Sequence, residues 1–221
     1  MAARRPDRKP FAKSPRRALA RVALAAAAGL AGCVTSVDGR RHRDANEGPW
    51  LEPTPQLALR IDEQVQRLPY THGEGRIEQI HWFATVGEPA YPQLLELVAD
   101  PRPDVAGTAL AALGATRDSR LIEHLRAVAL PEKIPATLRY EWARTYLRLG
   151  DWSEAPVLIR GLAEEELMVR ALCGQALFEA TGQRFGFQPK AEPAEREAAI
   201  ARWEAWWAAR QDEGVLVSST H

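Results

Sequence analysis

The sequence predicts an all-α protein, and more specifically a short right-handed α-solenoid of helical hairpins. From residue 54 onward, apolar residues recur at the spacing of a helix face, and no stretch alternates as a half-buried strand does. A fourteen-residue pattern also recurs along the chain at near-constant spacing. Such repeats bury their apolar faces only by stacking on their neighbours, so we expect consecutive hairpins in one array.

The first expected helix covers residues 54–68, and its apolar positions are Leu57, Leu59, Ile61 and Val65. A terminal repeat has one uncovered side, which some other element must close. We expect this helix to close the N-terminal end of the array.

Three segments, 105–118, 138–151 and 169–182, align over fourteen residues without a gap. Their first, fifth, eighth and ninth places lie on one face of an α-helix. These places hold Val105, Ala109, Ala112 and Leu113, then Leu138, Trp142, Thr145 and Tyr146, then Val169, Cys173, Ala176 and Leu177. A degenerate copy at 75–88 keeps the helix and Gly87, so repeats start near 75, 105, 138 and 169.

A second helix is expected after each of the first three copies, at 89–99, 119–130 and 152–163. Leu95, Leu125 and Leu158 each fall seven residues past the end of their copy. Each repeat is therefore predicted to be a helical hairpin.

The copies resemble the helix of HEAT repeats that has the pattern VR-x-x-A-x-x-A-L-x-x-x-G-D, especially the short bacterial form of phycobilisome-lyase-like proteins. Arg139 and Arg170 match the arginine after the first apolar place, and Asp118 and Asp151 match the closing aspartate, whereas Ala106 and Gly182 depart. The resemblance covers about residues 75–182. It implies the repeat scaffold and no lyase activity, because a fold does not define a function.

A loop over 181–193 interrupts the pattern before a helix expected at 194–211. Ile200, Trp203 and Trp207 share one face of that helix, with Trp206 beside them. We expect a Trp-rich cap on the last repeat, so that the solenoid domain spans 54–212 and a tail spans 213–221.

The aromatic residues Trp206, Phe185 and Phe187 are the candidate interaction surface, since aromatic side chains dominate binding hot spots. The alternative is that the aromatic residues of this region close the core of the last repeat. By their spacing, Trp203 and Trp207 are expected to point inward.

The N-terminal 32 residues have the pattern of an export signal. Basic residues precede a run of about ten apolar residues, 22–31, which is half the ~20 that a spanning helix needs. Leu30, Ala31 and Gly32 precede Cys33, and together they resemble the lipobox of bacterial lipoproteins, in which the cysteine is acylated and the leader removed. The alternative is an ordinary secretory signal in which Cys33 is incidental.

Residues 33–53 are expected to form the lipidated cysteine and a flexible tether. Val34 is not aspartate, which by the common lipoprotein sorting rule favours the periplasmic face of the outer membrane. The sequence leaves open whether export uses the general or the twin-arginine route.

Removal of the leader changes the charge of the chain. The 29 basic and 29 acidic residues balance in the full sequence, but the leader holds eight basic residues and one acidic residue. The remaining chain is acidic, which argues against nucleic acid as a partner, because phosphate binding needs a clustered basic face.

No chemical site is expected. His81 and His124 lie in different repeats without a matching carboxylate pattern, and no zinc spacing or phosphate-binding glycine loop is present. Cys173 occupies an apolar repeat place, so we expect a buried small residue and no reactive thiol. We predict no cofactor and no metal.

The sequence therefore predicts a non-enzymatic, lipid-anchored HEAT-like scaffold that binds unknown envelope proteins and meets the membrane through its lipid. A structural subunit of a larger envelope complex is one alternative. An enzyme or sensor with an unrecognised site is another.

Overall fold

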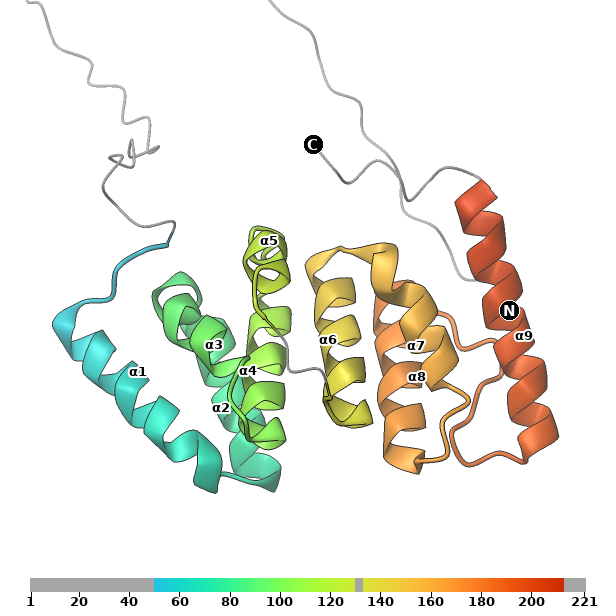
Figure 1. Ribbon diagram of the computed structural model, residues 1–221, viewed down its shortest axis with the longest axis horizontal. Helices are drawn as coiled ribbons and strands as arrows, with labels where there is room; N and C mark the ends of the chain where they lie inside the picture. The colour runs from blue at the N-terminus through green and yellow to red at the C-terminus, as the bar shows by residue number, and fades with distance from the viewer. Residues whose placement is uncertain (1–49, 130–132, 213–221) are drawn as a thin grey trace, which may run out of the picture. The chain divides into compact units, whose positions relative to one another are not determined.

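The computed structural model describes residues 50–129 and 133–212, all within the second of two compact units, Asp44–His221. Within these residues the chain forms α-helices, short 3-10 helices and turns, and no strand. The helices are α1 (Pro55–Arg67), α2 (Gly73–Val86), α3 (Tyr91–Leu97), α4 (Pro103–Thr116), α5 (Leu121–Arg126), α6 (Ala136–Leu149), α7 (Ala155–Gly161), α8 (Leu167–Thr181) and α9 (Pro193–Asp212). The predicted all-α class is confirmed (Figure 1).

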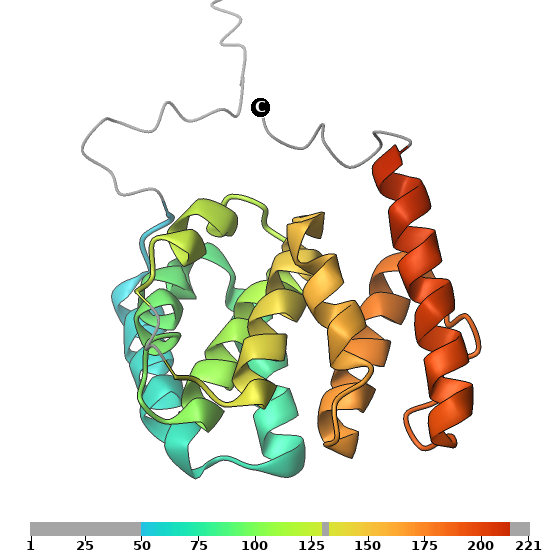
Figure 2. The same ribbon diagram turned by 45° about the vertical axis from the view of Figure 1, so that its right-hand side comes forward.

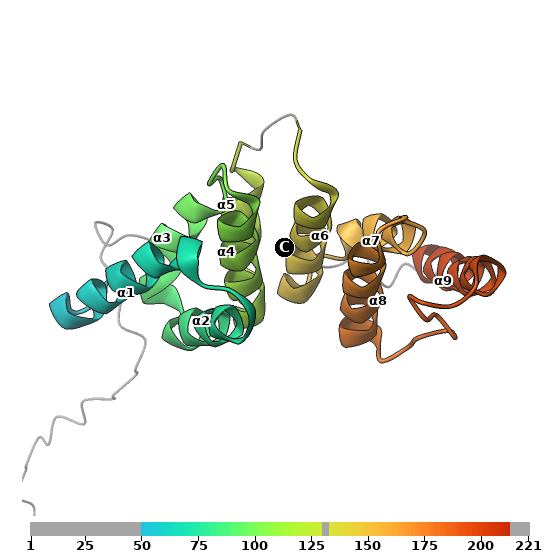
Figure 3. The same ribbon diagram turned by 90° about the horizontal axis from the view of Figure 1, so that it is seen from below.

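The helices that carry the fourteen-residue copies are α2, α4, α6 and α8, here named the first helices. Each contacts the next along the chain, α2 with α4, α4 with α6 and α6 with α8. Figure 3 shows α4 and α6 side by side when the unit is viewed from below. The second helices α3, α5 and α7 each contact the first helix that follows them.

The ends of the first helices explain one departure from the repeat pattern. In the first three copies the thirteenth place ends the helix with a positive φ, at Gly87 (69°), Arg117 (57°) and Gly150 (99°). In the last copy α8 continues one residue further, and Gly182 (71°) takes this role at the fourteenth place. Glycine suits this conformation because it has no Cβ to clash. Gly182 therefore stands where the other copies have Asp118 and Asp151.

The repeat places predicted to be apolar are inside the protein. All twelve residues of the three aligned copies are buried except Tyr146, which is half-buried. In the second helices Leu125 and Leu158 are buried as expected, but in α3 Leu94 is fully buried and Leu95 only half-buried. The register of α3 is shifted by one residue because the 3-10 turn Glu88–Ala90 follows Gly87 directly, whereas Asp151 separates Gly150 from the corresponding turn Trp152–Glu154 before α7.

The helix α1 is stabilised at its start by Thr54, whose Oγ1 accepts a hydrogen bond from the Leu57 amide at 3.3 Å. Ile61 is buried, and Leu57 and Val65 pack against the same core. Leu59 is 66% exposed, in contrast to the expectation, because two residues along a helix correspond to a turn of about 200°.

The last helix, α9, lies against α7 (Figure 2). Its buried residues are Ala199 and Trp203, and Ile200, Trp206 and Trp207 are half-buried against the same core. The expected inward face is thus confirmed most fully at Trp203.

Candidate functional site

The predicted lipid-attachment residue Cys33 and the processing residues Leu30, Ala31 and Gly32 lie outside the described residues. The described helices include none that is long and apolar enough to cross a membrane. The first described residue of the chain is Trp50, which lies within the predicted tether, 33–53, so the structure shows how the last residues of that segment join the helices.

Trp50 is packed into the side of the protein formed by second helices. It is 8% exposed, and its ring lies 4.9 Å from that of Tyr91 on α3 and 4.9 Å from that of His124 on α5. Arg120 lies over the same indole at 5.3 Å, a cation–π contact. These contacts fix the point at which the chain reaches the second helices.

The Arg120 guanidinium also joins two carboxylates around Trp50. Its Nη2 donates to Glu88 Oε1 at 2.5 Å and to Asp118 Oδ2 at 2.6 Å. The hydrogen bond from Arg120 lowers the pKa of Asp118, and Asp118 also accepts from the Arg120 backbone amide at 3.1 Å. Because the Leu51 amide donates to Glu88 at 3.1 Å, this network holds the backbone beside Trp50 as well.

The predicted aromatic surface is partly contradicted by the structure. Phe187 is buried, at 5% exposure, so it belongs to the core and cannot form an exposed surface. Phe185 and Trp206 are half-buried and contact one another at 6.3 Å. Trp206 also contacts Trp152, Trp203 and Trp207, so its ring is largely engaged within the protein.

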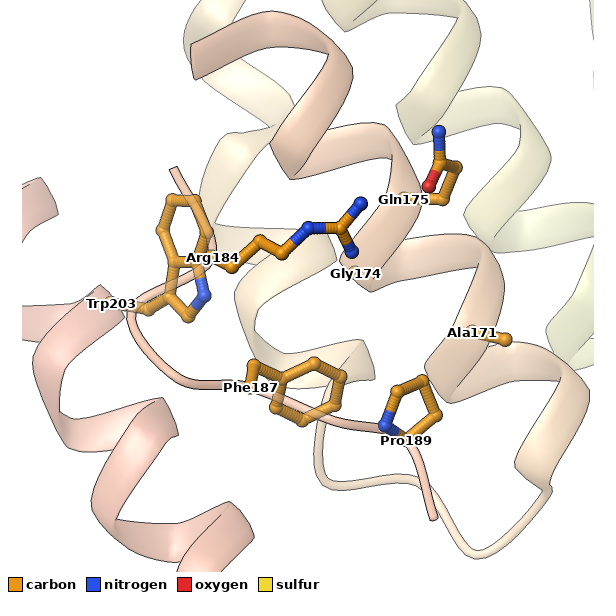
Figure 4. A pocket seen from close by; sticks show the side chains of 7 residues that line it. All are labelled: Ala171, Gly174, Gln175, Arg184, Phe187, Pro189 and Trp203. Atoms are coloured by element: carbon orange, nitrogen blue, oxygen red, sulfur yellow. The ribbon is translucent and has the colours of Figure 1, made fainter. Parts of the chain in front are cut away.

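A pocket of about 180 Å³ lies between α8 and the loop that precedes α9 (Figure 4). Phe187 and Trp203 line it from one side and Gly174 from the other, with Arg184 reaching across. Gly174 is needed here because a Cβ at this position would lie 3.0 Å from the Phe187 ring. The Arg184 guanidinium lies 3.9 Å from the centre of the Phe178 ring, and this cation–π contact holds Arg184 at the edge of the pocket.

A larger hollow, here named the first-helix groove, runs across all four first helices. It has a volume of about 270 Å³. On α4 it is lined by the small residues Gly107 and Ala111, here called its floor, and its other apolar lining residues, here called its walls, include Ile80, Leu138 and Leu172. Thr108, Glu141 and Leu172 occupy the fourth place of their copies, so the groove follows the repeat register.

Glu141 is the unusual group of the first-helix groove. It is 8% exposed, its Oε1 has no hydrogen-bond partner, and its Oε2 lies 3.4 Å from Arg144 Nη1. Burial is the largest influence on its carboxyl group and raises its pKa, against the opposing effect of Arg144. Arg144 Nε is also without a partner. A buried donor and a buried acceptor are therefore left open one helical turn apart.

Among residues 50–129 and 133–212 no three His, Cys, Asp or Glu side chains are grouped so as to hold a metal ion. Burial raises the pKa of the Cys173 thiol to about 12, so the nucleophilic thiolate is suppressed. His124 contacts Trp50, and His81 is exposed.

Two of these features were missed by the sequence reasoning. The first is the network of Arg120 with Glu88 and Asp118, which joins residues 32 positions apart. The second is the Glu141 and Arg144 pair, at the fourth and seventh places of the copy. The sequence signal for the second is the pair of opposite charges three residues apart on one helix, Glu141 and Arg144.

Comparison of the chain with protein-family models, with curated proteins and with solved structures finds no match.

Proposed function

We propose that the protein is an exported, lipid-anchored scaffold that binds a partner protein in the bacterial envelope through its first-helix groove. Its fold in this proposal is a short right-handed α-solenoid of HEAT-like hairpins. The observation that carries the proposal is that one groove is lined by all four first helices, three of which, α4, α6 and α8, contribute the same place of the repeat.

The helix contacts support the solenoid. The first helices contact one another in chain order, and each second helix contacts the first helix after it, as expected of stacked hairpins. The burial of Trp203 and Ala199 supports α9 as the Trp-rich cap of the last repeat, because both residues share a core with α6, α7 and α8.

The position of Trp50 supports the choice of binding face. It packs on Tyr91 of α3 and His124 of α5, both on second helices, whereas the groove is lined by first helices. The N-terminal segment therefore joins the fold at the second helices, and the groove is lined by the first helices.

The lipid anchor in this proposal is carried by Cys33, preceded by Leu30, Ala31 and Gly32. The support is the order of basic residues, apolar run and small residues before the cysteine. A single acyl chain anchors weakly, so the multiple acylation typical of lipoproteins would supply the stable attachment. The proposed location is the periplasmic face of the outer membrane.

Site-specific photo-crosslinking in membranes tests the binding face. A crosslinker at Met168 on α8 is expected to capture a discrete partner. Met168 is 68% exposed. It comes directly before the first place of its copy, as the groove residues Asp104 and Thr137 do in theirs. The matched control is a crosslinker at Glu123 on α5, whose side chain is 79% exposed. Equal adducts from both positions would contradict the proposed face.

The same membranes test the anchor and the type of assembly. Cys33→Ala is expected to move the protein from the membrane fraction to the soluble fraction, and its full retention in the membrane would contradict lipid anchoring. Recovery of a fixed stoichiometric set of proteins from the Met168 crosslink would instead favour a structural subunit of an envelope complex.

A further inference from the structure

We propose that the first-helix groove binds an uncharged, extended peptide segment of the partner, whose amide groups hydrogen-bond to Glu141 and Arg144. This inference rests on the proposed function, because it takes the groove as the partner-binding face, and it adds the chemistry of what is bound.

The open hydrogen-bonding groups define the first requirement. Glu141 Oε1 is a buried acceptor without a partner and Arg144 Nε is a buried donor without one, and both side chains line the groove. Buried polar groups are normally paired, so two open groups of opposite kind call for a ligand that supplies a donor and an acceptor together. A peptide amide supplies N–H and C=O within one unit.

The charges of the groove define the second requirement. Glu141 lies beside Arg144, Asp104 is 3.3 Å from Arg76, and Glu179 next to the groove is 2.7 Å from Arg148. Each charge thus has an opposite charge close to it within the protein. An added cation would approach Arg144 or Arg76, and an added anion would approach Glu141 or Asp104. An uncharged ligand avoids both repulsions.

The shape of the groove defines the third requirement. A Cβ at Gly107 would have only Leu138 Cδ1 nearby, at 3.9 Å, so the floor is open at this point. The volume of about 270 Å³ is just below the range of pockets that hold small ligands, roughly 300–1,000 Å³. With Ile80, Leu138 and Leu172 as walls, it suits a short stretch of chain with small aliphatic side chains.

Access to the open atoms requires a side-chain movement. Glu141 Oε1 and Arg144 Nε are both covered from solvent. The 3.4 Å separations of Arg144 from Glu141 and from Glu179 are long for charge-assisted hydrogen bonds, so these two contacts hold the Arg144 guanidinium only weakly. A rotation of Glu141 and Arg144 toward the groove would expose the pair to an entering amide.

The test is a titration of the full lipidated chain in nanodiscs, with isotope-labelled Ile and Leu methyl groups. The probe is acetyl-valyl-alanine methylamide, and the charged comparisons replace valine by lysine or by glutamate. We expect the methyl signals of Ile80, Leu138 and Leu172 to shift with the neutral probe and to need about tenfold more of either charged probe.

Two variants locate the effect. Gly107→Leu is expected to fill the groove and abolish the shifts, whereas the matched variant Ala115→Leu, at an exposed position of α4 outside the groove, is expected to keep them. Glu141→Leu removes the acceptor and is expected to weaken binding of the neutral probe about tenfold. A circular dichroism spectrum of each variant verifies that the helices remain formed.

Three outcomes would overturn the inference. These are equal or tighter binding of a charged probe, shifts that survive Gly107→Leu, and no shift with any probe, which would mean that the groove holds only water. If the Met168 crosslink to a partner persists in any of these cases, the proposed function stands and only the ligand chemistry fails. If the crosslink is absent while the neutral probe binds, the groove has the inferred chemistry and the proposed function fails.

Discussion

The described chain contains two hydrophobic cores, and the helix α6 takes part in both. Leu138, Trp142 and Leu149 face the first core, which is formed with α1 to α5, whereas Tyr140, Ala143 and Leu147 face the second, which is formed with α7 to α9. The first core contains three alanines and two leucines of α4, and the second contains the bulky Trp203 and Phe187 of the C-terminal region.

The two cores reach close packing by different means. On α4 small residues allow α6 to approach, and the Cβ that Gly114 lacks would lie 3.3 Å from the Thr145 backbone. Thr145 Oγ1 donates to the Leu110 carbonyl at 3.0 Å across the same contact. In the second core glycines instead make room for large side chains, as Gly161 does for Tyr140 and Gly174 for Phe187. The stability of the first core should therefore depend on the close approach of α4 and α6. The stability of the second core should depend on a few large aromatic side chains, here called its aromatic anchors.

The largest expected effect tests the aromatic anchor. Trp203→Ala should lower the free energy of unfolding by about 3–5 kcal/mol, because Trp203 is 1% exposed and its removal leaves a large cavity. The measurement is denaturant unfolding followed by circular dichroism. Trp206→Ala, at a half-buried ring on the same helix, should cost clearly less, and an equal loss would mean that no single residue anchors the second core.

A smaller effect is expected from filling the space that a glycine leaves in the second core. A Cβ at Gly161 would lie 2.3 Å from Cys173 Sγ and 2.7 Å from the Tyr140 ring. Gly161→Ala should therefore destabilise the protein by about 1–3 kcal/mol through overpacking. A thermal or denaturant midpoint equal to that of the parent would show that the second core can adjust, and the proposed tight packing there would be wrong.

The ion network beside the first core predicts a dependence on pH. The pKa of Asp118 is lowered from 3.8 by its hydrogen bond to Arg120, so its stabilising contribution is full above the unfolded value. The contribution is lost as the pH falls through the lower folded pKa. Asp118→Asn should cost about 1 kcal/mol at pH 7, and the difference from the parent should shrink below pH 3.8.

The control for this prediction is Glu63→Gln, which changes an exposed carboxyl group on α1 and should leave the unfolding curve within about 0.5 kcal/mol of the parent at each pH. A parallel loss for Asp118→Asn at all pH values would indicate that the charge of Asp118 is not what stabilises the network.

The smallest expected effect has the opposite sign. Gly107 is inside α4, and a Cβ there meets nothing closer than 3.9 Å. Gly107→Ala should raise the free energy of unfolding by about 0.5–1 kcal/mol, because alanine restricts the unfolded chain and favours the helix. A loss of stability from this variant would show that the groove floor is more crowded than its geometry indicates, and would remove the contrast with Gly161.

The sequence predicted the helices well because the information is local. The copies at 105–118, 138–151 and 169–182 each form a helix, and their apolar places are inside. The prediction was wrong where contacts between helices decide which side chains are buried. Leu59 is exposed, Leu94 replaces Leu95 in the core, and Phe187 is buried against Gly174 instead of on a surface.

Local patterns along the chain are enough to predict the positions of the helices, most of their buried residues and a lipid anchor at Cys33. Helical periodicity and the order of basic and apolar residues suffice for these, because they depend only on neighbours along the chain. The tertiary structure alone decided that Trp50 joins Arg120 and Tyr91, and that Glu141 and Arg144 lie in a groove with open hydrogen-bonding groups. These features depend on the side-chain volumes of adjacent helices and on how closely the helices pack, which the spacing of residues within one helix does not specify.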